Sequence, residues 1–328
     1  MNKPVNPSVE ETRARMRALL DVQKRAQTQK GPPSAALRKD RLTRAIDMVL
    51  THKDELVAAI VSDFGARSPD LTLFADVAAA VGPLKAARAE LDRWMKPQKR
   101  KVTPAALGLL GAKAEVRYQP KGVIGVVTPW NFPLSLAMDA IAGAFAAGNR
   151  VMLKPSEFTP ATSALMAQII DLYFDDDELA VIVGGPEVGA AFVGLPFDHL
   201  IFTGATSVGR HVMRAAADNL TPVTLELGGK SPVVIGRSAD LAKTAARVMN
   251  GKTMNAGQVC LAPDYVLAPK EHLDGFVAEV QAATARMFPT IKDNRDYTAM
   301  INQRHYDRVR GLIDDARTKG AQIVEINP

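Results

Sequence analysis

The sequence predicts an α/β protein, with a doubly wound parallel sheet followed by a second, incomplete α/β unit. From Gly122 onward, short β-branched runs alternate with helical stretches, which is typical of a parallel sheet built from strand–helix–strand units. A further set of strands and helices begins near Pro222 and stops at Pro328 without a closing helix. The order of the strands in space does not follow from this pattern.

Three helices are expected before the sheet. Apolar residues at three- and four-residue spacing predict them over Arg13–Lys30, Ser34–Phe64 and Leu71–Met95. The prolines and basic residues of Lys96–Pro104 interrupt this spacing. The alternating run Ala114–Tyr118 then predicts a strand.

The doubly wound sheet and the second unit follow in order. Strands of the sheet are expected at Gly122–Val127, Asn149–Lys154, Ala180–Gly185 and His199–Gly204, with helices at Leu134–Ala147, Pro160–Tyr173 and Ser207–Ala217. The second unit should hold strands at 224–229, 231–236, Asp264–Ala268 and 321–326, and helices at Leu241–Asn250, His272–Met287 and His305–Lys319. These patterns predict two domains, residues 1–221 and 222–328.

Composition and charge exclude several classes of protein. Among 328 residues, 47% are hydrophobic and 23% charged, as in ordinary globular domains. Apolar runs are too short to span a bilayer, the N-terminus lacks a signal-peptide pattern, and one cysteine cannot form an internal disulfide. We therefore expect a cytoplasmic protein with no membrane partner. The net charge is +6, but the densest basic run, Lys96–Lys101, has no interleaved aromatics, which favours a solvated connector over a nucleic-acid surface.

Cys260 is the first candidate for chemistry, in the segment NAGQVC. A lone cysteine is usually a small buried apolar residue. The small residues Asn255, Ala256 and Gly257 could instead form a loop that exposes a thiolate, and a thiolate is a good nucleophile toward a carbonyl. Local sequence leaves both interpretations open.

Glu226 and Asn131 are the companion candidates. Glu226 precedes a glycine pair in TLELGGKSP, where it could be a strand-end ion-pair partner or a general base that activates water. Asn131, in TPWNFP, lies in a turn rigidified by two prolines and could donate its amide to a developing oxyanion.

Two further segments suit a dinucleotide. Lys154 and Glu157 of KPSE end a strand and could reach a ribose, although a solvated ion pair is the simpler interpretation. FTGATSVG, from Phe202 to Gly209, leaves a strand and opens a helix, which suits a pyrophosphate, but an ordinary turn fits equally well. The five histidines are scattered and predict no metal site.

Together these segments resemble the aldehyde dehydrogenase superfamily. TPWNFP, KPSE, FTGATSVG, LELGGKSP and NAGQVC occur in the family's order, and Glu226 and Cys260 lie 34 positions apart (260 − 226), as the family's base and nucleophile do. The resemblance runs from about Leu37 to the end of the chain. LDRWMKP and APDYVL are similar to the class-three branch, and DFGARS to its coniferyl aldehyde dehydrogenase group.

The resemblance implies a role for each site residue. Cys260 would form a thiohemiacetal, Asn131 would hold the oxyanion, and Glu226 would activate water to release the acid. The cofactor would be NAD, with NADP tolerated, and Lys154 and Glu157 would hold its adenosine ribose. The remaining residues expected at the cofactor cleft are Pro129, Trp130, Gly204, Gly209 and Gly228.

Two departures from the family qualify this expectation. Ala205 stands where the family often has a serine that meets the pyrophosphate. Family members also continue well past Pro328, with an E-x-F-G-P motif, the rest of the catalytic domain and a strand used in dimerisation. We therefore expect an incomplete chain, a homodimer at full length, and a bridging strand pair over 101–119.

Three functions remain in competition. The first is NAD(P)-dependent oxidation of an aldehyde, with aromatic aldehydes favoured by the class-three likeness. The second is a CoA-acylating semialdehyde dehydrogenase or an acyl-phosphate reductase; such relatives share the cysteine but typically lack the base that Glu226 supplies. The third is an inactive piece that retains only cofactor binding.

Overall fold

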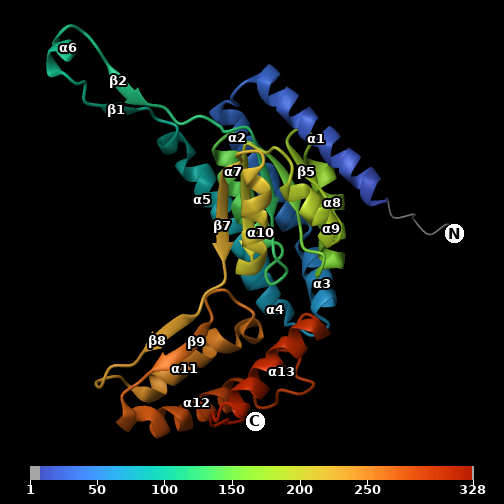
Figure 1. Cartoon of the computed structure of the whole chain (residues 1–328), viewed down its shortest axis with the longest axis vertical. Coiled ribbons are helices and arrows are strands. Elements are labelled where there is room, and N and C mark those ends of the chain that lie inside the picture. Colours follow the sequence, from blue (N-terminus) through green and yellow to red (C-terminus); the bar gives the residue numbers. More distant parts are fainter. Residues whose placement is uncertain (1–7, 327–328) are drawn as a thin grey trace.

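The computed structural model describes residues 8–326, so residues 1–7 and 327–328 of the predicted domains lie outside the described part. A five-stranded parallel sheet, in the order β5-β4-β3-β6-β7, forms the centre of the larger part of the molecule. Helices cover both faces, and a smaller unit with β8, β9, α11, α12 and α13 follows the sheet (Figure 1). The predicted α/β class and doubly wound parallel sheet are confirmed.

The N-terminal helices begin at side-chain caps. Ser8 caps α1 (Val9–Lys30) in a capping box with Glu11, and Ser34 caps α2 (Ala35–Thr51). The single helix expected over Ser34–Phe64 is wrong, because α2 ends at Thr51 and, after His52, a separate helix α3 (Lys53–Phe64) begins. The apolar spacing continues across the break, so the spacing alone did not reveal it.

The third predicted helix contains an irregular turn. After α4 (Pro69–Thr72), residues Leu73–Ala78 form the π-helix η1, and α5 (Ala79–Trp94) continues from it. Turns of this kind are rare and often mark functional sites. This one carries Asp76, whose side chain is fully buried.

Strands of the sheet form where β-branched residues recur. Their bounds are β3 Val123–Val127, β4 Arg150–Lys154, β5 Leu179–Val181, β6 His199–Gly204 and β7 Val223–Leu227. All neighbouring pairs run parallel. We expected the strand of Glu226 in the second unit, but β7 pairs with β6 and is an edge strand of the main sheet.

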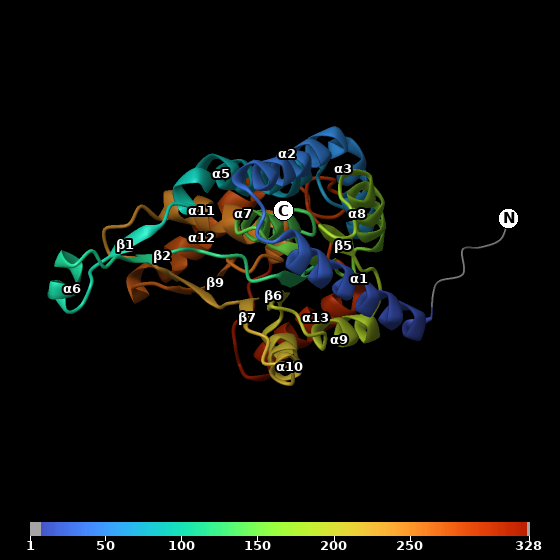
Figure 2. The same cartoon turned by 90° about the horizontal axis from the view of Figure 1, so that it is seen from above.

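Two apolar layers flank the sheet because strand residues alternate between its faces. Ile124 and Val126 face a core shared with α2, α5, α7 and α8, whereas Val123 faces a core shared with α1, α9 and α10. Figure 2 shows α2, α3 and α5 on one side of the sheet and α9 and α10 on the other. The helices that follow the strands are α7 Ser135–Ala146, α8 Pro160–Tyr173, α9 Pro186–Val193 and α10 Thr206–Ala217.

An arm projects away from the sheet between α5 and β3 (Figure 1). It consists of β1 (Gln98–Arg100), the short helix α6 (Ala105–Leu109) and β2 (Ala114–Val116). The two strands pair antiparallel, so a strand pair exists, but its first strand lies just ahead of the expected range 101–119.

The second unit is a small sheet with helices. Its elements are β8 Ser231–Val234, α11 Leu241–Thr253, η2 Met254–Gly257, β9 Pro263–Leu267, η3 Lys270–His272, α12 Leu273–Met287 and α13 Gln303–Thr318. β8 and β9 pair parallel, and Ile235, Ala245 and Phe276 form the buried core. The strand expected over 321–326 is wrong, since these residues form no strand and belong to none of the sheets that the described residues form.

Candidate active site

The motifs identified in the sequence meet at the carboxyl ends of the strands of the main sheet. In register, Val127 of β3 pairs with Lys154 of β4 and Phe202 of β6, and Thr203 of β6 pairs with Glu226 of β7. β3 leads through α7 to β4 on one side, whereas β6 leads through α10 to β7 on the other. Ligands of doubly wound sheets bind at such a switch point, so a crevice is expected between the turns after β3 and β6.

Lys154 and Glu157 lie together at the end of β4. The Lys154 ammonium is almost fully buried, 3.7 Å from the Glu157 carboxylate, and donates to the carbonyl of Pro155 at 2.8 Å. Burial lowers the pKa of Lys154, and the neighbouring Glu157 opposes that shift. The pair offers one donor group and one acceptor group, which is the set that ribose hydroxyls require.

The turn after β6 is shaped by two glycines. A Cβ at Gly204 would lie 2.6 Å from the Phe202 ring, and one at Gly209 would lie 2.9 Å from Leu227 Cδ2, so neither position has room for a side chain. Ala205 precedes α10, which has no side-chain cap. The N–H groups of the first turn therefore remain open to an anionic group such as a pyrophosphate.

The turn after β3 is partly buried. The hydroxyl of Thr128, the residue that follows β3, is buried without a hydrogen-bond partner among residues 8–326. Pro129 and Trp130 follow, both half-buried. The Trp130 ring packs 5.0 Å from His305 of α13 and 6.3 Å from Phe64, so it also joins the second unit to the sheet.

A strained loop precedes Cys260. Asn255 and Ala256 have φ of 50° and 54°, and Gly257 has 75°, so three consecutive residues adopt the left-handed region. Non-glycine residues avoid this region, and such strain clusters at functional sites. A Cβ at Gly257 would lie 3.1 Å from the Lys252 carbonyl oxygen. After this reversal Cys260 is exposed with a free thiol, so the buried alternative does not hold.

Glu226 and Cys260 come from adjoining segments. A Cβ at Gly229 would lie 3.7 Å from the carbonyl oxygen of Cys260, so the glycine turn after β7 lies against the backbone of Cys260. Lys230 and Asp264 join the same two segments by an ion pair at 2.7 Å. Glu226 is exposed and has no ion-pair partner within the described residues, so its carboxylate is free to accept a proton. Gly228 is exposed, and a Cβ there would meet no described atom within 4 Å.

Asn131 contacts the loop that precedes Cys260 directly. Its amide Nδ2 donates to the carbonyl of Gln258 at 3.0 Å, two residues before Cys260. The structure thus brings Asn131, Cys260 and the turn after Glu226 together, although they belong to three separate segments. One N–H of the Asn131 amide is used in this contact, which leaves the second available.

Sequence reasoning missed two residues of this assembly. The side chain of Gln258 donates to the carbonyls of Asn255 (2.9 Å) and Ala299 (3.0 Å) and accepts from the N–H of Ile301 (3.1 Å). Arg67 donates to the carbonyl of Asn131 at 3.0 Å. Nothing in the sequence indicates a structural role for Gln258 except its place in NAGQVC, or for Arg67 except its place in DFGARS.

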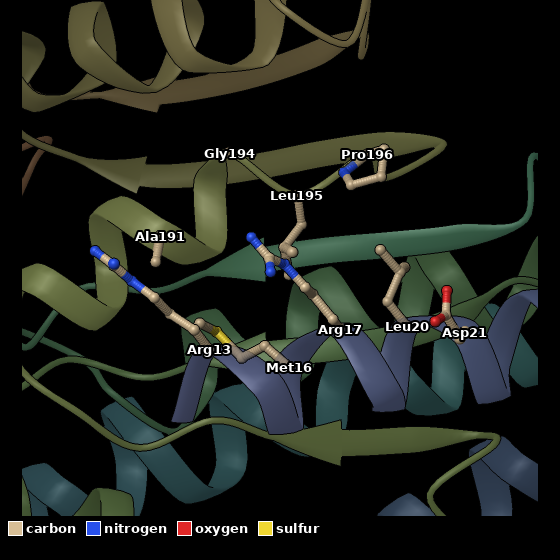
Figure 3. Close-up of a pocket in the computed structure, with 9 residues that line it drawn as sticks. All are labelled: Arg13, Met16, Arg17, Leu20, Asp21, Ala191, Gly194, Leu195 and Pro196. Atoms are coloured by element: carbon tan, nitrogen blue, oxygen red, sulfur yellow. The ribbon is translucent and has the colours of Figure 1, made fainter. Parts of the chain in front are cut away.

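The structure also contains two cavities. One, of about 510 Å³, opens between α1 and the turn after α9, with Arg13, Met16 and Leu195 among its lining residues (Figure 3). A second, of about 780 Å³, is lined by Ala256 and by residues of the segment 291–306, and Cys260 lines neither. Over residues 8–326, no cluster of ligands suits a metal and no helix has both the length and the apolarity to cross a membrane.

Comparison with known proteins identifies relatives along nearly the whole chain. The profile of the Aldehyde dehydrogenase family matches residues 5–325. A probable coniferyl aldehyde dehydrogenase of Caulobacter vibrioides is 62% identical over all of the chain and 68% of the relative. A coniferyl aldehyde dehydrogenase of a Pseudomonas species is 54% identical over 94% of the chain and 63% of the relative.

Solved structures share the fold. The structure of a Mycobacterium tuberculosis aldehyde dehydrogenase complexed with NAD+ is similar with a TM-score of 0.84 and 28% identity, over 95% of this chain and 64% of that one. The chain spans about two thirds of the length of these relatives.

Proposed function

The chain belongs to the aldehyde dehydrogenase family, and we propose that it carries the nucleophile, the general base and the NAD site for oxidation of an aldehyde to a carboxylic acid. The observation that supports this most directly is the convergence of Asn131 and the Gly229 turn on the segment of Cys260. The exposed thiol, an amide donor and the strand end that carries a free carboxylate are the groups that this reaction requires.

The reaction begins at the thiol. The Cys260 thiolate attacks the carbonyl carbon and forms a C–S bond, while the carbonyl electron pair becomes an oxyanion. The free N–H of the Asn131 amide donates to that oxyanion and stabilises it. NAD+, when bound, would accept a hydride from the same carbon, which would leave that carbon as a thioester on Cys260.

Glu226 then acts on water. Its carboxylate takes a proton from a water molecule as the oxygen attacks the thioester carbon, and the C–S bond breaks to release the carboxylic acid. Exposure of the Glu226 carboxylate allows it to exchange that proton with solvent afterwards. A reaction that transfers the acyl group to CoA would not need this base, so the second function considered above is disfavoured.

The residues at the sheet edge fit NAD. Lys154 and Glu157 would hold the adenosine ribose, the open first turn of α10 would receive the pyrophosphate, and the unpartnered hydroxyl of Thr128 offers one more polar contact. Glu157 would repel a phosphate on the ribose, so NAD is the preferred cofactor. Pro129, Trp130, Gly204 and Gly209 would shape the same crevice, and Gly228 would border it.

An aromatic aldehyde of the coniferyl type is the proposed substrate. This part of the proposal rests on the names of the two relatives described above. We also propose that the protein acts as a homodimer in the cytoplasm.

The test combines the purified protein with NAD and coniferyl aldehyde, with and without CoA, and follows NADH and acid formation. NADH is expected without CoA, and Cys260→Ala should abolish it while leaving the fold intact, because little volume is removed. NADH formation that persists in Cys260→Ala, or that requires CoA, contradicts the mechanism. NAD binding without any NADH supports the third function, a binding piece.

A further inference from the structure

Arg67 and Asp76 form a buried ion pair next to the turn that carries Asn131. Arg67 Nη2 lies 2.6 Å from Asp76 Oδ2, and both side chains are fully shielded from solvent. The guanidinium lies 4.6 Å from the ring of Phe64 and 5.2 Å from the ring of Phe132. These contacts leave the pair little freedom to move.

The pair holds the turn at both ends. Arg67 Nη1 donates to the carbonyl of Asn131 at 3.0 Å. Asp76 Oδ1 accepts from the N–H groups of Leu134 (3.3 Å) and Ser135 (3.4 Å), where α7 begins. α7 has no side-chain cap of its own, so Asp76 supplies one from another element. Residues 131–135 are therefore held at one end by Arg67 and at the other by Asp76, and these two side chains are bonded to each other.

Stability alone is a poor explanation for this arrangement. Replacing a buried ion pair by apolar residues of similar volume is often neutral or stabilising, because both charges must be removed from water. Burial raises the pKa of Asp76 to about 6, against the opposing effect of Arg67. A pair that is costly to bury but bonded to both ends of one turn points to a geometric role.

We propose that Arg67 and Asp76 are positioning residues that hold the Asn131 amide in place to receive the oxyanion at Cys260. This inference rests on the proposed function and deepens it. Arg67 fixes the backbone of Asn131, and Asp76 fixes the start of α7. The Asn131 side chain can then reach the carbonyl of Gln258 and present its second N–H toward the thiol.

Two reagents separate this role from a merely structural one. With p-nitrophenyl acetate, the thiolate attacks the carbonyl carbon, an oxyanion forms, and p-nitrophenolate leaves with the electron pair of the broken C–O bond. With iodoacetamide, the thiolate displaces iodide and no oxyanion forms. Cys260 is the only cysteine, so the part of each rate that Cys260→Ala abolishes belongs to this thiol, and neither reaction requires NAD. The ratio of acylation rate to alkylation rate measures the oxyanion site.

Two variants disrupt, in different ways, the clamp that Arg67 and Asp76 form around residues 131–135. Arg67→Met with Asp76→Leu removes both charges at once, so neither is left buried alone. Arg67→Lys keeps a charge for Asp76 but replaces the forked guanidinium by a single ammonium, which cannot hold both partners in the same geometry. We expect acylation to fall at least about tenfold in both, because small misplacements of a catalytic group are costly. Alkylation should be unchanged.

Asn131→Ala and Arg41→Met serve as reference and control. Asn131→Ala should lower acylation by about 100-fold, the usual effect of losing an oxyanion donor. Arg41→Met breaks another buried pair, with Glu178 at 2.8 Å, at the opposite end of the strands, and should leave the ratio unchanged. If Asn131→Ala slows acylation but both clamp variants keep the wild-type ratio, the positioning role is wrong. If Asn131→Ala itself has no effect, the oxyanion role in the proposed function fails, and the inference fails with it.

Discussion

Asp76→Asn should change how stability depends on pH. Burial raises the pKa of Asp76 to about 6 from its ordinary 3.8, and this difference corresponds to about 3 kcal/mol. Because the folded protein holds the proton more tightly, the stability contributed by Asp76 is full below about pH 3.8 and is lost as pH rises through about 6. Between about pH 4.5 and 7, the wild type should lose about 2 kcal/mol that Asp76→Asn does not lose.

The measurement is urea unfolding of both proteins across that pH range, compared as a difference so that other groups cancel. Leaving Arg67 without its partner should destabilise the variant by a constant amount, since arginine does not titrate there. Glu178→Gln is the matched control with opposite sign. Burial raises the pKa of Glu178, but its partners Arg44 and Arg41 lower it by more, so the net shift is downward. The stability that Glu178 contributes is therefore present at higher pH and lost as the pH falls. A difference between wild type and Asp76→Asn that stays flat with pH would refute the reasoning.

Three further predictions concern the site. Glu226→Gln should give a burst of NADH followed by turnover slowed by about 100-fold or more, because only the water step needs the carboxylate; simultaneous loss of the burst in rapid-mixing experiments would place Glu226 earlier in the reaction. Glu157→Gln should raise kcat/KM for NADP relative to NAD by about tenfold, as expected for one charge-assisted contact, and an unchanged ratio would remove Glu157 from the ribose site. Gln258→Leu removes three hydrogen bonds to neighbouring segments and should lower the free energy of unfolding by about 2–4 kcal/mol; urea unfolding indistinguishable from the wild type contradicts that estimate.

Local signals in the sequence predicted the regular elements well. α8 occupies the expected Pro160–Tyr173 because proline suits the first position of a helix. β6 occupies the expected His199–Gly204. The break at His52 was missed because apolar spacing continues across it. The sheet that β7 joins could not be predicted, since strand pairing is decided by distant neighbours rather than by the strand itself.

In the candidate site too, local features were predictable from the sequence and long-range contacts were not. Motifs predicted which residues are candidates for chemistry, and the structure brings Asn131 next to the loop of Cys260 from 127 positions away, counted to Gln258. The supporting contacts were invisible in the sequence. Arg67 donates to a backbone carbonyl 64 positions away. Every residue has such a carbonyl, so no sequence motif could indicate which one Arg67 contacts. Side-chain contacts to backbone groups depend on how the loops meet, which local patterns do not contain.

The position of β7 restricts where this protein can be recombined with another. The sequence pattern suggests a domain boundary between residues 221 and 222. A chimera joined there would take β7 from the second parent protein and so replace the strand with which β6 pairs. The parallel pairing from Leu200 to Gly204 and the packing of Leu227 against Gly209 would then have to be rebuilt by residues that never evolved together. A junction at Gly228 and Gly229 keeps the sheet whole and transfers the segment of Cys260 as a unit. Exchanging substrate preference between relatives should therefore succeed more often at the glycine pair than six residues before it.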